Sequence, residues 1–156
     1  MQPKGSDFYT PAGYRSKNHN PLTESMEDYL EMIFRLSAEE GFARVNELAA
    51  QLNVTPSSSS KMVSVLRENG LVEFEKYGVI RLTAEGSRRG EWLLHRHLVL
   101  VRFFHALGDK KHALDLAEQV EHCLPEETVC HLEALSGFME QNDWSASAAN
   151  KDSLPE

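Results

Sequence analysis

The chain has 156 residues, with 16 Lys and Arg against 24 Asp and Glu, and a formal net charge of −8. This length suits one domain or two small domains that share a core. No apolar run approaches the ~18 residues of a membrane-spanning helix. An acidic chain is a poor candidate for binding nucleic acid over its whole surface. However, residues 44–89 hold seven basic and five acidic residues, whereas the remainder holds nine and nineteen. The acid excess therefore lies outside the middle of the chain.

Both ends of the chain lack the patterns of folded structure. Residues 1–21 and 141–156 are polar and have no hydrophobic period, so we expect a disordered arm and a disordered tail. The first residues also lack the apolar core of a secretion signal. The spacing of Cys123 and Cys130 fits neither a zinc pair nor a disulfide framework. We therefore expect a cytoplasmic protein with reduced thiols.

Residues 22–90 are predicted to form a winged helix-turn-helix domain, because three helices and a β-hairpin follow one another in the order of that fold. Hydrophobic period and end signals place the helices at about 24–38, 44–52 and 55–69, and the hairpin at 71–82. The third helix has the clearest start, since Thr55 suits the N-cap and Pro56 the first helical position. In the first helix, Ser25 fits the cap of a capping box, with Asp28 as its acid.

The start of the third helix is the candidate DNA-contacting surface. Short hydroxyl side chains let a helix end lie deep in the major groove, where free backbone N–H groups also favour phosphate. Met62, Val65 and Leu66 are expected to face the core instead. The candidate DNA-binding residues are Thr55, Ser57, Ser58, Ser59, Lys61 and Lys76. The alternative is a merely solvated helix face, and winged helices also serve as protein-interaction modules.

Residues 91–140 are predicted to form a second, helical domain, which makes the fold class mostly α. We expect helices at about 84–107, with Thr83 as the N-cap, and at about 110–123 and 125–139. The first of these is apolar over a wide arc that a domain of this size does not easily cover alone. A second copy of the chain is the expected cover, so the helical domain would also be the dimerisation domain.

Glu118, Glu121 and His122 form the candidate metal-binding motif. On a helix, residues three and four apart share a face, so these side chains would converge on one point. Burying two acids and a histidine is costly unless a cation or donors compensate them. Sites rich in oxygen with a histidine suit divalent metals. Glu and His are also common on solvated helix faces, so other parts of the chain must support this interpretation.

Taken together, these pieces resemble the diphtheria-toxin-repressor family of metal-dependent transcription regulators, and most closely its manganese transport regulator branch. The resemblance covers about Thr23 to Met139. It rests on the joint order of short segments: 25–31, 41–45, 55–58 with 61–63, 75–77, 82–83 with Gly86, 96–97, and Glu118 with Glu121-His122. The chain departs from the family in the wing, where Gly78 follows Tyr77 directly and one more residue is expected.

The resemblance implies a metal site and a regulatory function. Six ligands would hold two Mn²⁺ ions per subunit, with Glu118 and Glu121 bridging, and Fe²⁺, Co²⁺, Zn²⁺ or Cd²⁺ could substitute. The implied ligands are Asp28, Glu31, His97, Glu118, Glu121 and His122. The metal-loaded homodimer would bind palindromic operator DNA and repress metal-uptake genes. Iron-responsive relatives carry methionine and cysteine where this chain has Asp28 and Glu118.

Three other functions remain to be weighed. A metal-dependent hydrolase is one, since Glu118-x-x-Glu121-His122 resembles His-x-x-Glu-His, but the first histidine is replaced and no nucleophile is evident. A carboxylate-bridged di-metal enzyme would need a Glu-x-x-His on each of two bundle helices, which neither acid provides. The third is a winged-helix interaction module that senses no metal. The sequence favours a regulator over an enzyme.

Overall fold

The computed structural model describes residues 22–142 and 144, so the predictions for the arm and for most of the tail lie outside the described residues. Its elements are α2 (Glu24–Glu40), β1 (Ala43–Arg44), α3 (Val45–Gln51), α4 (Pro56–Glu68), β2 (Val72–Phe74), the 3-10 turn η1 (Lys76–Gly78), β3 (Val79–Leu82), α5 (Ala84–Ala106), α6 (Ala113–Val120), the 3-10 turn η2 (Glu121–Cys123) and α7 (Glu126–Gln141). The predicted fold class, mostly helical with a winged helix-turn-helix, is confirmed. None of the described helices is long and apolar enough to cross a membrane.

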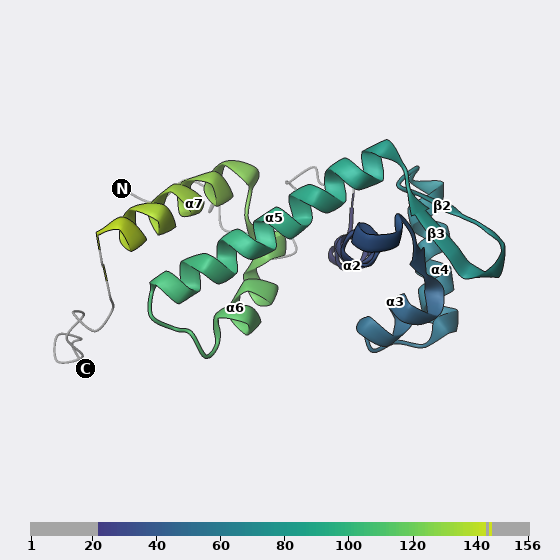
Figure 1. Ribbon diagram of the computed structural model, residues 1–156, viewed down its shortest axis with the longest axis horizontal. Helices are drawn as coiled ribbons and strands as arrows, with labels where there is room; N and C mark the ends of the chain where they lie inside the picture. The colour runs from purple at the N-terminus through teal and green to yellow at the C-terminus, as the bar shows by residue number, and fades with distance from the viewer. Residues whose placement is uncertain (1–21, 143, 145–156) are drawn as a thin grey trace, which may run out of the picture.

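The long helix α5 connects two groups of elements. At one end lie α2, α3, α4 and the small sheet, and at the other lie α6 and α7 (Figure 1). The hydrophobic core of the first group contains Leu30, Ile33 and Leu48, which are fully buried, and extends to Leu93 on α5. The start of α5 therefore belongs to the core of the first group, while the rest of α5 supports the second.

Side-chain caps fix where the helices begin. Thr55 Oγ1 accepts the N–H of Ser58 at 3.2 Å, and Thr83 Oγ1 accepts that of Gly86 at 3.0 Å, as predicted. The capping box at Ser25 is wrong, because Thr23 Oγ1 accepts the N–H of Met26 at 3.3 Å and starts α2 earlier. Asp28 therefore lies beyond the first turn of α2, where its carboxylate is free of a capping role.

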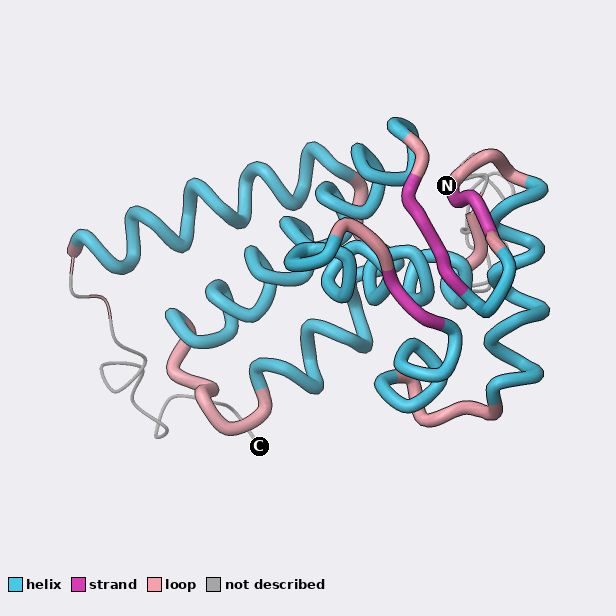
Figure 2. The backbone as a smooth tube through the Cα atoms, turned by 45° about the vertical axis from the view of Figure 1, so that its right-hand side comes forward, coloured by secondary structure: helices cyan, strands magenta, loops and turns pink. Residues whose placement is uncertain are grey.

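The sheet contains one strand that the sequence pattern did not reveal. The strand order is β1-β3-β2, and both pairings are antiparallel (Figure 2). In β1, Arg44 lies opposite Val79 of β3, although Arg44 was expected to begin a helix. A strand of two residues is too short to show an alternating pattern, and only its pairing with β3 defines it.

The wing turn between β2 and β3 projects from the end of the molecule (Figure 1). Both Tyr77 (φ 64°) and Gly78 (φ 74°) are left-handed there. Tight hairpin turns with positive φ at consecutive residues favour Asn or Gly, so Tyr77 is an unusual occupant of this position. Its side chain is 96% exposed. The wing thus displays an aromatic ring that packs very little against its own subunit.

The buried face of α4 differs from the expected one. Ser59, Val63 and Leu66 point into the core and are fully buried, whereas Val65 is 38% exposed. Ser59, Val63 and Leu66 are spaced four and three residues apart, so they lie on one face of the helix. The prediction that Leu66 faces the core is confirmed, and the prediction that Val65 does so is wrong. Ser59 cannot contact DNA from this position, so its assignment as a DNA-binding residue is also wrong.

The first turns of α5 pack directly against the winged-helix domain. A Cβ atom added at Gly86 would lie 1.8 Å from the carbonyl oxygen of Leu71, and one added at Gly90 would lie 2.7 Å from Cβ of Phe34. Gly137 on α7 is different, because an added Cβ would meet only Arg102 Nη2, at 3.8 Å. Glycine is therefore required where α5 begins but not at this point of α7.

These two positions give a matched pair of substitutions. Gly86→Ala should lower the free energy of unfolding by about 3 kcal/mol, because the backbone of Leu71 must move to admit the methyl group. Gly137→Ala should raise it by about 0.5–1 kcal/mol through helix propensity. Urea denaturation followed by circular dichroism measures both changes. An unchanged midpoint for Gly86→Ala would contradict the close contact.

Candidate metal centre

Five of the six predicted metal ligands form two groups that share one residue. Asp28, Glu121 and His122 place ligand atoms within 4.8 Å of one another, as do His97, Glu118 and Glu121. Asp28 comes from α2, His97 from α5, Glu118 from α6, and Glu121 and His122 from η2. The shared residue, Glu121, has one carboxylate oxygen toward each group. The groups therefore lie side by side at the junction of the two ends of the molecule.

The helix predicted over residues 110–123 is shorter in the structure at both ends. Asp109 Oδ1 accepts the N–H of His112, and α6 begins only at Ala113. At the other end, α6 stops at Val120 because Pro125 forces Leu124 into an extended conformation (ψ 124°), which leaves room only for the 3-10 turn η2. Glu118, Glu121 and His122 consequently do not form one regular helical face. The change of helix type directs Glu121 toward α5 and His122 toward α2.

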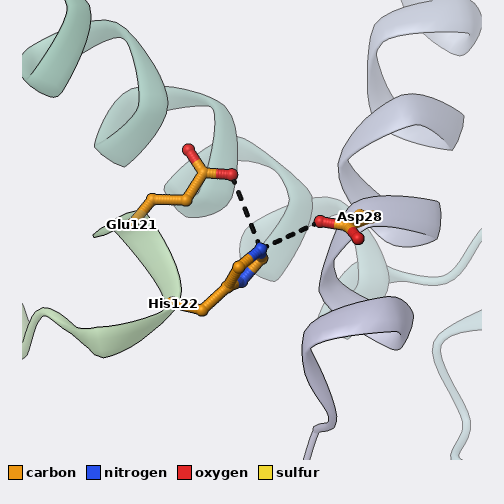
Figure 3. A group of neighbouring side chains, drawn as sticks. All are labelled: Asp28, Glu121 and His122. Atoms are coloured by element: carbon orange, nitrogen blue, oxygen red, sulfur yellow. Dashed lines mark ion pairs between the residues drawn. The ribbon is translucent and has the colours of Figure 1, made fainter. Parts of the chain in front are cut away.

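The first group is centred on the imidazole of His122. Figure 3 shows this ring between Asp28 and Glu121, and its Nε2 lies 3.0 Å from Asp28 Oδ1 and 3.8 Å from Glu121 Oε1. Hydrogen bonds to Asp28 and to Glu27 raise the pKa of His122 to about 10. The protonated ring therefore supplies the positive charge among these acids when no metal is bound.

The second group is more deeply buried. His97 Nδ1 lies 3.0 Å from Glu121 Oε2 and 3.5 Å from Glu118 Oε1, and both His97 and Glu121 are buried. The hydrogen bond that His97 donates to the Glu121 carboxylate raises the pKa of His97. Partial burial and the neighbouring charge of Glu121 raise the pKa of Glu118. Each shift has the direction expected where acids crowd together and lack a cation.

Glu31, the sixth predicted ligand, stands apart from both groups. Its carboxylate accepts a hydrogen bond from Arg35 Nε at 3.0 Å on the same helix. It nevertheless lines a cavity of about 320 Å³ together with Asp28, Glu118 and Glu121. The carboxylate thus lies at the wall of the site and is held there by an arginine.

The donors of the two groups fit a divalent cation. Each group offers two carboxylates and one imidazole, and no cysteine or methionine belongs to either. Oxygen donors with imidazole suit the harder first-row metals. A cation there would neutralise the acids and take the place of the imidazolium charges, because metal and proton compete for the same atoms.

Sequence reasoning missed two buried charged residues beside the first group. Glu27 and Arg96 are each 4% exposed, and Arg96 Nη2 lies 2.9 Å from Glu27 Oε2. The same carboxylate oxygen lies 2.7 Å from Nδ1 of His122. A signal was present in the sequence, because Arg96 interrupts the apolar arc of α5 and Glu27 lies next to the buried stripe of α2. Neither position indicates by itself which partner it meets.

The remaining candidate DNA-binding residues lie on the surface. Thr55, Ser57, Ser58 and Lys61 are exposed at the start of α4, and Lys76 is exposed in the wing. Thr55 also caps α4 and its hydroxyl donates to Ser58 Oγ at 3.0 Å. Apart from Ser59, the structure leaves every one of these residues accessible to a partner.

Comparisons with known proteins agree with this arrangement. The model of the iron-dependent repressor N-terminal DNA-binding domain matches residues 21–80, and that of the iron-dependent repressor metal-binding and dimerisation domain matches residues 83–147. The chain is 38% identical over 121 residues to the HTH-type transcriptional regulator MntR of Lysinibacillus sphaericus (strain C3-41), a match that covers 77% of this chain and 87% of the relative.

Two solved structures share the fold. The protein SSo2273 from Sulfolobus solfataricus is 32% identical, with a TM-score of 0.58 and coverage of 74% of this chain and 90% of that one. A manganese-dependent transcriptional repressor in complex with manganese is 27% identical, with a TM-score of 0.65 and coverage of 72% and 53%. The resemblance found in the sequence is therefore confirmed. The chain belongs to the iron-dependent repressor family of metal-dependent transcription regulators, and it is a DNA-binding regulator rather than an enzyme.

Proposed function

We propose that this protein is a manganese-responsive repressor whose metal-loaded homodimer binds palindromic operator DNA and represses metal-uptake genes. The observation that carries this proposal is the origin of the first ligand group. Asp28 belongs to the winged-helix domain, whereas Glu121 and His122 belong to the other end of the molecule. A cation bound by all three residues would hold the two ends at a fixed distance and angle.

This tie between the two ends explains how metal would control DNA binding. A palindromic operator requires two recognition helices separated by whole turns of DNA. Without a cation, the acids of the two ligand groups are compensated by protonated histidines, which hold the two ends together less firmly than a shared metal ion would. Metal would then shift the population toward the orientation that fits DNA. The position of Glu121 in both groups supports two ions per subunit, with Glu121 as one bridging acid. Glu118 belongs to one group only, and its predicted bridging role needs it to turn toward the other.

The donor set supports manganese as the sensed metal. Mn²⁺ accepts many oxygen ligands, whereas Zn²⁺ prefers four-coordinate sites and would leave part of this set unused. Zn²⁺ still binds most such sites more tightly than Mn²⁺, so selectivity must come from the response to binding and not from affinity. Fe²⁺, Co²⁺ or Cd²⁺ could occupy the same ligands.

The surface proposed to bind DNA and the surface proposed to bind a second copy of the chain lie at opposite ends of the molecule. Thr55, Ser57, Ser58 and Lys61 at the start of α4, together with Lys76 in the wing, would face the operator, in the cytoplasm where the DNA is. At the other end, large apolar side chains are exposed on three helices, which fits coverage by a second copy. These residues are Leu98 on α5, Leu114 on α6, and Leu135 and Phe138 on α7.

Metal dependence is tested by a gel-shift titration. The purified protein should retard a palindromic fragment, selected from a random duplex library, in the presence of Mn²⁺ and far less in the presence of a chelator. The chelator removes the cation that fixes the two ends. Equal retardation in both conditions at one salt concentration would instead support a winged-helix module that senses no metal.

The DNA surface is tested with a matched pair on α4. Lys61→Ala should weaken binding to all sequences and reduce the salt dependence by about one counterion, because one phosphate contact is lost. Ser59→Ala should leave DNA binding unchanged, since the buried hydroxyl faces the core, where it has no hydrogen-bond partner. Both variants should bind Mn²⁺ like the wild type. If Ser59→Ala weakened DNA binding and Lys61→Ala did not, the orientation assigned to α4 would be refuted.

The metal preference is tested at Asp28. Wild-type protein should bind DNA best with Mn²⁺, while Zn²⁺ binds the protein more tightly yet activates poorly. Asp28→Met should make Fe²⁺ or Co²⁺ comparatively more effective, because a sulfur donor favours later metals. DNA-binding titrations with each metal, with metal stoichiometry measured alongside, give the ranking. A ranking that is the same in the variant would remove Asp28 from metal choice.

A further inference from the structure

The two ring nitrogens of His122 face different acids. Nε2 is directed toward Asp28 and Glu121, the members of the first ligand group, whereas Nδ1 lies 2.7 Å from Glu27 Oε2. Only Nε2 can therefore offer its lone pair to a cation in that group. A ligating histidine almost always donates its other N–H to a carboxylate or carbonyl, which fixes its orientation and strengthens it as a ligand.

We infer that Glu27 and Arg96 are positioning residues for His122, an inference that rests on the proposed metal site. Glu27 receives the Nδ1–H of His122, and Arg96 holds the same carboxylate oxygen from α5 at 2.9 Å. Both side chains are almost fully buried, so few other orientations are open to them. A buried, ionised carboxylate without a positively charged partner is strongly unfavourable. Arg96 is therefore needed to keep Glu27 ionised and able to accept the hydrogen bond from His122.

This chain of contacts crosses the junction between the two ends of the molecule. Glu27 lies on α2, Arg96 on α5 and His122 on η2, at sequence separations of 69 and 95 residues from Glu27. The alignment of His122 therefore depends on how α2 packs against α5. Glu27 thus orients the imidazole of the first ligand group. It does not orient the imidazole of the second group in this way, because Nδ1 of His97 itself faces Glu121 and Glu118.

The test measures Mn²⁺ affinity by equilibrium dialysis and Co²⁺ coordination by absorption spectroscopy. Glu27→Gln should weaken Mn²⁺ binding at the first group by about 10–100-fold and change the Co²⁺ spectrum. The matched control is Glu140→Gln, which breaks another Glu–Arg pair that involves α5, between Glu140 and Arg102. The control should keep the wild-type affinity and the wild-type spectrum.

Two backgrounds separate positioning from a general structural role. With His97→Ala, only the first group remains complete, and adding Glu27→Gln should produce the full loss of affinity. With Asp28→Asn, the second group remains, and adding Glu27→Gln should change its affinity less than threefold. Equal losses in both backgrounds, or no loss in either, would overturn the inference. Absence of Mn²⁺ binding by the wild type would refute the proposed function instead.

Glu27→Gln leaves Arg96 as a buried, unpaired charge, so folding is checked separately. The double variant Glu27→Gln/Arg96→Met removes both charges and keeps similar volumes. It should fold like the wild type, as judged by circular dichroism, and show the same selective loss at the first group. A folded double variant with wild-type Mn²⁺ affinity would also overturn the inference.

Discussion

The structure depends on the crowding of acids where its two ends meet. Glu27, Asp28, Glu118 and Glu121 approach one another there from three different elements, and such a cluster is stable only if positive charge is supplied. Arg96 supplies a permanent charge, and the two histidines supply charge when they are protonated. These positive charges offset part of the repulsion among the acids, and a divalent cation could compensate the remainder in a more directional way.

In the proposed function, the location of this cluster would link metal binding to the geometry of DNA recognition. The helix α2 supplies Asp28 to the site and also packs in the core that supports α3 and α4. A change in the position of α2 relative to α5 would therefore move α4, which carries the candidate DNA-binding residues, as well. Such coupling requires no long pathway of small shifts, because one rigid helix takes part in both the site and the winged-helix core.

The two glycines at the start of α5 limit where the two ends of the molecule can move relative to each other. Gly86 lies against the backbone of Leu71, and Gly90 lies against Phe34 of α2. These close contacts anchor the first turns of α5 to the winged-helix domain. Relative motion of the two ends would then have to occur beyond them, nearer to His97, where the candidate ligands from the different helices approach one another.

The sequence alone determined the elements whose signals are local. Threonine caps at Thr55 and Thr83 and the apolar period of the helices placed the winged helix and α5. The joint order of short segments also identified the family and predicted a set of ligands. Local side-chain chemistry decides these features, so they can be inferred without knowledge of distant contacts.

Other features were decided only by tertiary structure. The strand β1 exists through its pairing with β3, and the end of α6 at Val120 sends Glu121 and His122 in different directions. The burial of Ser59 depends on which face of α4 meets the core. The pairing of Glu27 with Arg96 joins residues 69 positions apart. A charged residue in an amphipathic helix shows no sign of its partner in the sequence, because that partner is selected by how the helices pack.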